Sequence, residues 1–542
     1  MKPHIRDKVD ALFKAWDRDD SPGCVLGLIH GDEMVYTRGY GMANLEYGIP
    51  ITPETIFYIA STSKQFTAAC ILLLAQKGHL SLQDDIRTYL SEMNVYTQPI
   101  RVEHLILHTS GLREHGVLSE LAGLCPLDYR TADAVALVCR QKGVNYPAGE
   151  SFLYNNAGYV LLAEIVERVS GQPFAHFVQE QIFDPLGMRS THFGDDCTRI
   201  VPNRAASYEA AAGGGYRQLL MSNNVLGSAG VMTSVHDLQR WESNFHHPLV
   251  GGEGFVRQME RRGQLNNGES LNYGMGLMHG ELLGMKTIFH TGTEFGYRSI
   301  MLRFPEQRFT ILCLANLASF SPDTMAEKVA RVWLAEQTQA GSTSAVVKIE
   351  TQPEIDLEEI TGLYTDPQSG AFTVLTLQEG KLFAEVLGSA LPLLISEHTA
   401  SAAEESISLA YAERYLSMPL DIRLERKDRS SDWVMQAALG SCEYPALRRL
   451  PQAGLEEGRL AEYCGVYYSP ELQTAYELCV KNGKLATTHP RGLRGALTPG
   501  QKDFFVLPGV SLRFYRNKNM QIEGFHLWEL RARNIEFTRS TP

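Results

Sequence analysis

The chain has 542 residues, of which 44% are hydrophobic and 21% are charged, and its formal net charge at pH 7 is -12. This composition is typical of a folded globular protein, and the length exceeds what one hydrophobic core normally supports. The negative charge argues against nucleic acid or an acidic membrane as a partner, and no apolar stretch reaches the ~18 residues of a membrane span. We therefore expect a multidomain protein that binds neither.

The first residues of the chain bear on where in the cell the protein is located. It carries Arg6, Lys8 and Lys14 where a signal peptide needs an apolar core. We expect a cytoplasmic protein, or a periplasmic one if a leader has been removed. The nine cysteines are scattered, without a Cys-x-x-Cys or Cys/His cluster, so we expect no metal and no other cofactor.

Apolar segments at residues 24–30 and 34–38 predict two paired strands. A further segment at 56–59 leads into Ser61-Thr62-Ser63-Lys64, which opens an apolar run that ends near Gln76 and is typical of a buried helix. On a helix, the Lys64 amine can reach the Ser61 hydroxyl and, with a lowered pKa, take its proton. The pattern also arises by chance at a polar helix start, so it needs support from elsewhere.

Two motifs with catalytic residue types follow. His-Thr-Ser-Gly at 108–111 lies in a predicted helix-to-loop turn, and we assign it a structural role. Tyr154-Asn155-Asn156 precedes a predicted helix over residues 159–169. Near a lysine, Tyr154 could be partly phenolate or pass a proton, and Asn156 could bind a substrate carbonyl and hold Lys64. The alternative is a buried tyrosine followed by an asparagine helix cap.

Strands are predicted at 288–289, 299–304 and 309–314, and a closing helix at 324–334. Strands from both ends of residues 1–335 predict one sheet with helices on both faces. His290-Thr291-Gly292 lies on the first of these strands, where the glycine would let a substrate backbone approach closely. Alone, this triplet also fits a strand end with a hydrogen-bonded histidine.

The sequence beyond residue 335 predicts β structure. Small polar residues at 336–354 indicate a linker, and beyond it residues recur at an offset of 103 positions, as in Tyr364 and Tyr467. We expect two small antiparallel β-barrel domains, at 355–452 and 453–542, with hairpin turns at Glu379-Gly380 and Asn482-Gly483.

The order of Ser61-x-x-Lys64, Tyr154-x-Asn156 and His290-Thr291-Gly292 resembles the signature of serine β-lactamases and penicillin-binding proteins, in the branch with class C β-lactamases, D-Ala-D-Ala carboxypeptidases and D-aminopeptidases. Stretches such as Tyr-Gly-Met-Gly-Leu at 273–277 extend the resemblance over residues 10–335. It implies an α/β-sandwich catalytic domain at 1–335, with an antiparallel sheet flanked by helices and an all-helical subdomain at roughly 80–190.

The resemblance also implies roles for individual residues. Ser61 would be the acylated nucleophile, Lys64 its base and Tyr154 the acid/base partner. Backbone N–H groups of Ser61 and Thr293 would form the oxyanion hole. The residues that would line the substrate site are Asn156, His290, Thr291, Gly292 and Thr293.

Two features bear on the substrate. His290 stands where most β-lactamases have lysine, so strong penicillinase activity is not expected. A catalytic domain with two related barrels resembles D-stereospecific aminopeptidases, in which a loop of the last domain reaches the active site. The corresponding loop is 489–495, whose Arg491 and Arg494 would suit a substrate carboxylate, with a solvated basic turn as the alternative.

We therefore expect a serine hydrolase that cleaves amide bonds of small D-amino acid amides or peptides through an acyl-enzyme. A carboxylesterase, a weak β-lactamase and a D,D-carboxypeptidase are alternatives with the same chemistry. A non-catalytic protein that binds peptidoglycan fragments is the alternative of another class, and the three intact motifs argue against it. The expected partner is a small-molecule or peptide substrate, and a homodimer is left open.

Overall fold

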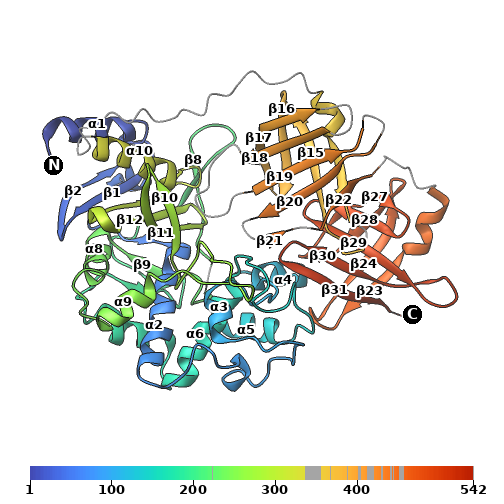
Figure 1. Cartoon of the computed structure of the whole chain (residues 1–542), viewed down its shortest axis with the longest axis horizontal. Helices are drawn as coiled ribbons and strands as arrows, with labels where there is room; N and C mark the ends of the chain where they lie inside the picture. Colours follow the sequence, from blue (N-terminus) through green and yellow to red (C-terminus); the bar gives the residue numbers. More distant parts are fainter. Residues whose placement is uncertain are drawn as a thin grey trace.

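The computed structural model describes residues 1–222, 224–335, 356–366, 368–386, 389–400, 405–411, 420–428, 431–439, 442–443, 445–450 and 457–540. Figure 1 shows an α/β part, in blue to yellow, beside two β-sheet bodies in orange and red. The linker predicted at 336–354 lies outside the described residues. Within the described ranges, no helix has the length and apolar character needed to cross a bilayer.

A six-stranded antiparallel sheet with the order β10-β11-β12-β13-β1-β2 forms the centre of the α/β part. Its strands are β1 (Cys24–His30), β2 (Glu33–Tyr40), β10 (Met278–Leu282), β11 (Met285–Glu294), β12 (Tyr297–Phe304) and β13 (Phe309–Ala315). Because β1 pairs with β13, the two ends of this part meet in one sheet, as the sequence predicts.

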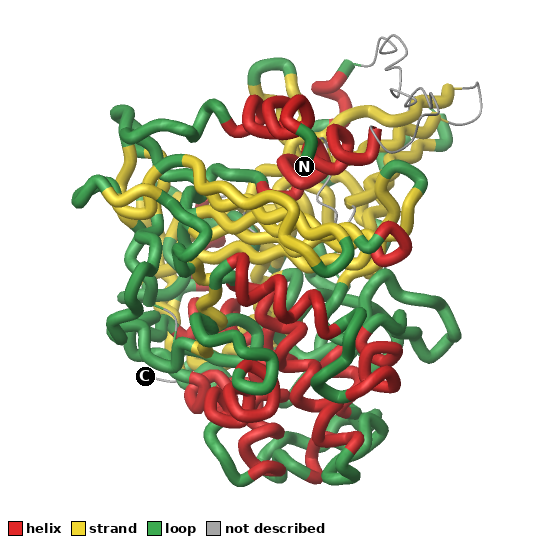
Figure 2. Tube along the Cα trace, turned by 90° about the vertical axis from the view of Figure 1, so that its left-hand side faces the viewer, coloured by secondary structure: helices red, strands yellow, loops and turns green. Residues whose placement is uncertain are grey.

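Helices cover both faces of this sheet, which Figure 2 shows as a yellow layer with red helices above and below it. On one face, α1 (Pro3–Phe13) and α10 (Pro322–Ala335) pack on β1 and β13 through residues such as Val9 and Leu28. The other face is covered by α2 (Lys64–Gln76) and α8 (Val235–Asn244). α2 is buried on nearly all sides, which explains why its sequence is apolar almost throughout.

Residues between the short strands β5 and β6 are helical, so the predicted helical subdomain is confirmed. Its elements are η2 (Ile86–Thr88), α3 (Val102–Ile106), α4 (His115–Ala122), α5 (Thr131–Cys139), α6 (Asn156–Ser170), α7 (Phe174–Val178) and the π-helical turn η3 (Gln179–Phe183). The remaining elements of the α/β part are β3 (Met42–Asn44), β4 (Ile49–Pro50), β5 (Phe57–Tyr58), β6 (His192–Phe193), β7 (Tyr208–Ala210), β8 (Tyr216–Gln218), β9 (Val231–Thr233), α9 (Gly252–Met259) and the 3₁₀ turns η1 (Ala60–Ser63) and η4 (Pro305–Gln307).

Two antiparallel barrels follow, as the sequence predicts. The first, after η5 (Leu357–Ile360), has β14 (Gly362–Thr365), β15 (Phe372–Gln378), β16 (Lys381–Val386), β17 (Ser389–Ala400), β18 (Glu405–Tyr411), β19 (Leu420–Arg426), β20 (Val434–Leu439), β21 (Cys442–Glu443) and β22 (Leu447–Arg449). Pairing of β19 with β20 closes it. The second, after η6 (Glu457–Tyr463), has β23 (Gly465–Ser469), β24 (Thr474–Lys481), β25 (Lys484–Thr488), β26 (Gly495–Ala496), β27 (Thr498–Gln501), β28 (Phe504–Leu507), β29 (Val510–Arg516), β30 (Ile522–Glu529) and β31 (Ala532–Arg539).

The two barrels repeat local structure at the same offset as the sequence. The Tyr364 hydroxyl donates to the carbonyl of Ile360, and the Tyr467 hydroxyl donates to that of Tyr463, both at 2.9 Å. In the first hairpin of each barrel, the two turn residues have positive φ, 50° and 74° at Glu379 and Gly380 and 51° and 72° at Asn482 and Gly483. Two consecutive left-handed residues are typical of a type I′ turn, so both predicted hairpins are present.

Candidate active site

Ser61 lies on a short 3₁₀ turn, η1, directly before α2 rather than on the first α-helical turn. The preceding residue, Ala60, has a φ of 46°, a left-handed conformation that residues other than glycine rarely adopt. Such strained backbone concentrates at functional sites. The chain therefore bends sharply before Ser61, whose side chain stays partly exposed while Thr62 to Lys64 are buried.

Lys64 is surrounded by three oxygen atoms. Its Nζ donates hydrogen bonds to Ser61 Oγ at 3.1 Å, to Asn156 Oδ1 at 2.8 Å and to the carbonyl oxygen of Ser228 at 2.6 Å. Three residues predicted for the site, Ser61, Lys64 and Asn156, thus meet. The Ser228 carbonyl was missed, because a backbone oxygen carries no sequence signal.

The Lys64 amine is chemically suited to act as a base. Burial lowers its pKa from 10.5 to about 7, against the opposing negative charges of Glu114 and Glu294. A lysine with this pKa is largely unprotonated just above neutral pH, so it can accept a proton from the adjacent Ser61 hydroxyl. The spacing of Ser61 and Lys64 predicts that the two side chains meet. The protonation state of Lys64, in contrast, depends on its burial in the complete fold.

Tyr154 lies beside this pair, with Lys64 Nζ 4.8 Å from the centroid of its ring. Its hydroxyl is buried and has no hydrogen-bond partner of suitable geometry among the described residues. Burial raises the pKa of Tyr154 above its ordinary value, and the nearby Ser61 hydroxyl offsets this only in part. Tyr154 is therefore protonated at neutral pH, which favours a proton donor over the phenolate that the sequence left open.

His108 packs directly behind Tyr154, with ring centroids 4.3 Å apart. Its φ of 59° turns the chain after α3, and its Nδ1 accepts a hydrogen bond from the backbone N–H of Asn155 at 3.0 Å. The Asn155 side chain caps α6 by accepting from the Gly158 N–H at 3.1 Å, so the helix cap is Asn155 and Asn156 is free to bind Lys64. The segment at 108–111, given a structural role from sequence, therefore fixes the Tyr154 loop.

The third motif lies on β11, against the turn that carries the nucleophile. A Cβ atom at Gly292 would overlap the carbonyl oxygen of Ile59, so only glycine permits this approach. Ser299 Oγ on β12 donates to the same carbonyl at 2.8 Å and lies 2.9 Å from Thr62 Oγ1. These contacts bring His290, Thr291 and Gly292 to the edge of the Ser61 turn. Thr293 is exposed on the same strand.

His290 is neutral in this setting. Burial, assisted by the positive charge of Lys64, lowers its pKa to about 3. Its Nδ1 lies 2.6 Å from the carbonyl oxygen of Thr291, which fixes the proton there, and its Nε2 accepts from the Tyr273 hydroxyl at 3.2 Å. The third motif therefore supplies no fixed positive charge, in contrast to a lysine at the same place.

The α/β part of the chain matches a known family. The sequence model of the family described as Beta-lactamase matches residues 8–332. The chain belongs to the β-lactamase family. Among relatives of this β-lactamase-family chain, the D-aminopeptidase of Gluconobacter oxydans (strain 621H) is 26% identical over 351 residues, which are 64% of this chain and 63% of that protein. The matched part thus spans less than two thirds of that relative.

Solved structures show the same β-lactamase fold. The octameric penicillin-binding protein homologue from Pyrococcus abyssi is 21% identical, with a TM-score of 0.56 over 82% of this chain and 99% of that one. The D-amino acid amidase from Ochrobactrum anthropi SV3, complexed with L-phenylalanine, is 21% identical, with a TM-score of 0.54 over 61% of this chain and 99% of that one. At these identities the likeness concerns the fold alone.

A residue that sequence reasoning missed, Glu114, links the candidate site to the last barrel. Its carboxylate accepts hydrogen bonds from the backbone N–H groups of Asn156 at 2.6 Å and Gly116 at 3.4 Å. Burial opposes its ionisation, but the charges of His115 and Arg531 and these two N–H donors lower its pKa overall. Its own N–H donates to the carbonyl of Arg531 at 2.9 Å. The only sequence feature that could have pointed to Glu114 is that an acidic residue follows the segment at 108–111 so closely.

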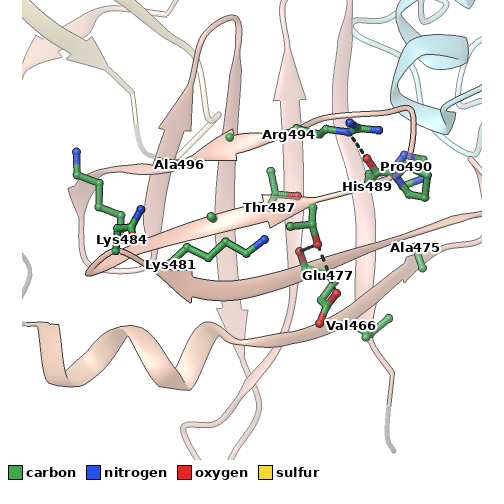
Figure 3. A pocket seen from close by; sticks show the side chains of 14 residues that line it. Val466, Ala475, Glu477, Lys481, Lys484, Thr487, His489, Pro490, Arg494 and Ala496 are labelled. Carbon is green, nitrogen blue, oxygen red and sulfur yellow. Dashed lines mark hydrogen bonds between the residues drawn. The ribbon is translucent and has the colours of Figure 1, made fainter.

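Arg491 and Arg494 lie on another part of the last barrel. Both side chains are exposed, and the Arg494 Nε donates to the carbonyl of His489. Arg494, Lys481 and Lys484 are among the residues that line a groove of about 940 Å³ on β23 to β26. Figure 3 shows their side chains. The loop touches the C-terminal end of α4 through the Tyr476 hydroxyl, which donates to Leu121 O at 2.6 Å and accepts from Leu493 N at 3.0 Å. No described hydrogen bond joins either arginine with Ser61, Lys64 or Tyr154.

Proposed function

We propose that the protein is a serine hydrolase that cleaves amide bonds of small D-amino acid amides or peptides through an acyl-enzyme on Ser61. The observation that carries this proposal is the buried Lys64 amine, 3.1 Å from Ser61 Oγ and with a pKa of about 7. The D-aminopeptidase among the sequence relatives supports the substrate class.

The proposed acylation begins when neutral Lys64 takes the proton of Ser61 and the Ser61 oxygen attacks the amide carbonyl. Backbone N–H groups of Ser61 and Thr293 stabilise the oxyanion, an effect of about 3 kcal/mol for each donor. Tyr154 gives its proton to the leaving nitrogen as the C–N bond breaks, and the protonated Lys64 resupplies Tyr154. Water then hydrolyses the ester by the reverse proton path.

The surrounding residues have supporting roles in this scheme. Asn156 holds the Lys64 amine in place through its 2.8 Å hydrogen bond. His290, Thr291 and Gly292 line the substrate site along β11, and the neutral His290 disfavours a β-lactam carboxylate at that point. A carboxylesterase remains the second candidate, because the same nucleophile attacks esters, whose barriers are lower.

Other expectations from the sequence stay predictions. We keep domains at 1–335, 355–452 and 453–542, supported by sheets that end at β22 and begin at β23. A substrate contact of Arg491 and Arg494, a cytoplasmic location and a homodimer also stay predictions. Size-exclusion chromatography with light scattering would decide the last.

The test of the proposed function combines labelling with a pair of enantiomers. Intact mass spectrometry should find one fluorophosphonate adduct on the wild-type protein and none on Ser61→Ala, with both proteins unfolding at similar temperatures. D-alanine p-nitroanilide should be hydrolysed faster than its L-enantiomer. Turnover of p-nitrophenyl acetate without any turnover of the anilide would favour the carboxylesterase and contradict the proposal.

A further inference from the structure

The turn between β30 and β31 is fixed to the helical subdomain beside the candidate active site. The carbonyl oxygen of Arg531 accepts hydrogen bonds from the Glu114 N–H and from Asn145 Nδ2, each at 2.9 Å. The Arg533 N–H in turn donates to Asn145 Oδ1 at 2.9 Å. Figure 1 shows α4, which begins directly after Glu114, facing the red strands β30 and β31. These hydrogen bonds therefore hold the backbone of Arg531 against the helical subdomain.

The Arg531 guanidinium acts on the site through its charge. That charge lowers the pKa of Glu114 and of Tyr154, where it opposes the larger effect of burial. It also lowers the pKa of His115, where burial acts in the same direction. Its side chain is partly buried, and its Nε has no hydrogen-bond partner among the described residues. One donor of this cation, its Nε, thus lacks a partner within the described ranges, and the turn that carries it is bonded to Glu114, whose carboxylate accepts from the backbone of Asn156 in the Tyr154 loop.

Two acidic side chains near Arg531, Glu114 and Glu529, accept hydrogen bonds from backbone N–H groups rather than from its guanidinium. Glu114 receives two backbone N–H groups, from Asn156 and Gly116. Glu529 accepts from the backbone N–H of Arg531 at 2.6 Å, and burial raises its pKa above the ordinary value. No ion pair within 4.0 Å joins Arg531 to a carboxylate in the described part of the chain. An incoming carboxylate would therefore find the Arg531 Nε without another acceptor from the residues that the structure describes.

The place of Arg531 relative to Tyr154 indicates which part of a substrate it meets. In the proposed mechanism, Tyr154 protonates the leaving nitrogen, so the groups attached to that nitrogen lie on the Tyr154 side. We propose that Arg531 binds the α-carboxylate of a leaving amino acid, so that small D-peptides with a free C-terminus are preferred over simple amides. A guanidinium matches a carboxylate through two parallel hydrogen bonds. This inference rests on the proposed function and names its substrate class.

The test compares two substrates that differ only in this carboxylate, D-alanyl-D-alanine and its C-terminal amide. The wild-type enzyme should prefer the free acid in kcat/KM. Arg531→Gln should lower kcat/KM for the free acid about 10- to 100-fold, mainly through KM, as expected for a lost charge-assisted hydrogen bond. The amide should change by less than about 3-fold, and Arg531→Lys should restore part of the preference, since it keeps the charge without the fork.

Arg533→Gln is the matched control, because it removes the same charge two residues away, where the Arg533 Nε donates to the carbonyl of Leu530 at 3.1 Å and the guanidinium lies 5.8 Å from the centroid of the Trp528 ring. It should keep the preference for the free acid. An equal loss for both substrates in Arg531→Gln, or no preference in the wild type, would overturn the role of Arg531.

A binding measurement separates this inference from the proposed function. Both dipeptides are used to slow fluorophosphonate labelling of Ser61. Labelling without turnover of any D-substrate would contradict the function, and stronger protection by the free acid would still support Arg531. Equal protection by both dipeptides overturns the inference alone, whereas an unlabelled wild-type protein overturns both.

Discussion

At the scale of single residues, Lys64 is the side chain best suited to act as the base of the candidate site. Its amine is fully buried and bonded to Ser61, Asn156 and the Ser228 carbonyl, and burial brings its pKa to about 7. The spacing of Ser61 and Lys64 was predictable because it is local. The Ser228 carbonyl, 164 positions further along the chain, was not, since no local pattern places a backbone oxygen.

The rate of Ser61 acylation should depend on pH through Lys64. Because only the neutral amine accepts a proton, the rate should rise with pH, with a midpoint near 7, and level off above it. Tyr154 does not interfere, since its raised pKa keeps it protonated over this range. Stopped-flow labelling by a fluorophosphonate between about pH 5 and pH 9 would measure the profile.

Glu114→Gln provides a check on the sign of this effect. The negative charge of Glu114 raises the pKa of Lys64, so its removal should move the midpoint of the profile to lower pH. The amide oxygen of glutamine can still accept from the Asn156 N–H. A midpoint that stays in place, or a rate that falls as pH rises, would contradict Lys64 as the base.

At the scale of elements, the candidate active site lies where η1 meets β11. The sequence predicted strands from both ends of the α/β part, because apolar segments mark them, and the sheet confirms this. It placed Ser61 at the start of an α-helix, whereas the structure has a 3₁₀ turn preceded by Ala60 with φ of 46°. Hydrophobic periodicity does not distinguish the two kinds of turn, nor does it reveal a left-handed alanine.

Gly292→Ala should separate η1 from β11. The added methyl group would overlap the Ile59 carbonyl oxygen, which is backbone and is also bonded to Ser299. We expect a loss of stability of about 2 kcal/mol or more and a large loss of acylation, since overpacking shifts backbone. Urea unfolding and fluorophosphonate labelling would measure the two effects.

Gly280→Ala on β10 is the control for the same sheet. Its added Cβ would meet side-chain atoms of Thr287 and Phe289 at 3.2 and 3.3 Å, where small rotations suffice. The variant should label Ser61 normally. If Gly292→Ala labelled equally well, the close contact between the motif and the nucleophile turn would not matter for the chemistry.

At the scale of the whole molecule, the last barrel docks on the helical subdomain at both ends of α4. The turn at Arg531 meets the residue before its first turn, and the Tyr476 hydroxyl meets Leu121 near its end. Directly before Glu114, Arg113 forms an ion pair with Glu471 at 2.7 Å, with side chains 3% and 5% exposed. The sequence repeat predicted two barrels, but contacts between residues more than 350 positions apart leave no periodic pattern to read.

Breaking this ion pair should weaken docking. Arg113→Met leaves Glu471 buried without its charge partner, which costs about 3–5 kcal/mol. The double variant Arg113→Met with Glu471→Met should recover part of that loss, because no unpaired charge remains. Urea unfolding of the wild type, Arg113→Met, Glu471→Met and the double variant would give the coupling energy, and additive losses would contradict it. The single variant should also weaken the preference for free-acid dipeptides, since Arg531 depends on the same docking.

The docking of the β30–β31 turn also has a consequence for the order in which the protein becomes functional during synthesis. Ser61 and Arg531 are separated by 470 positions in the chain. A ribosome that adds about 5 to 20 residues per second needs roughly 24 to 94 s to travel between them. Throughout that interval, the nucleophile and its base are already made while the turn that holds the Glu114 backbone is not. A nascent chain therefore contains Ser61 and Lys64 long before the last hairpin leaves the ribosome and docks, and the proposed selectivity of Arg531 can arise only after that step.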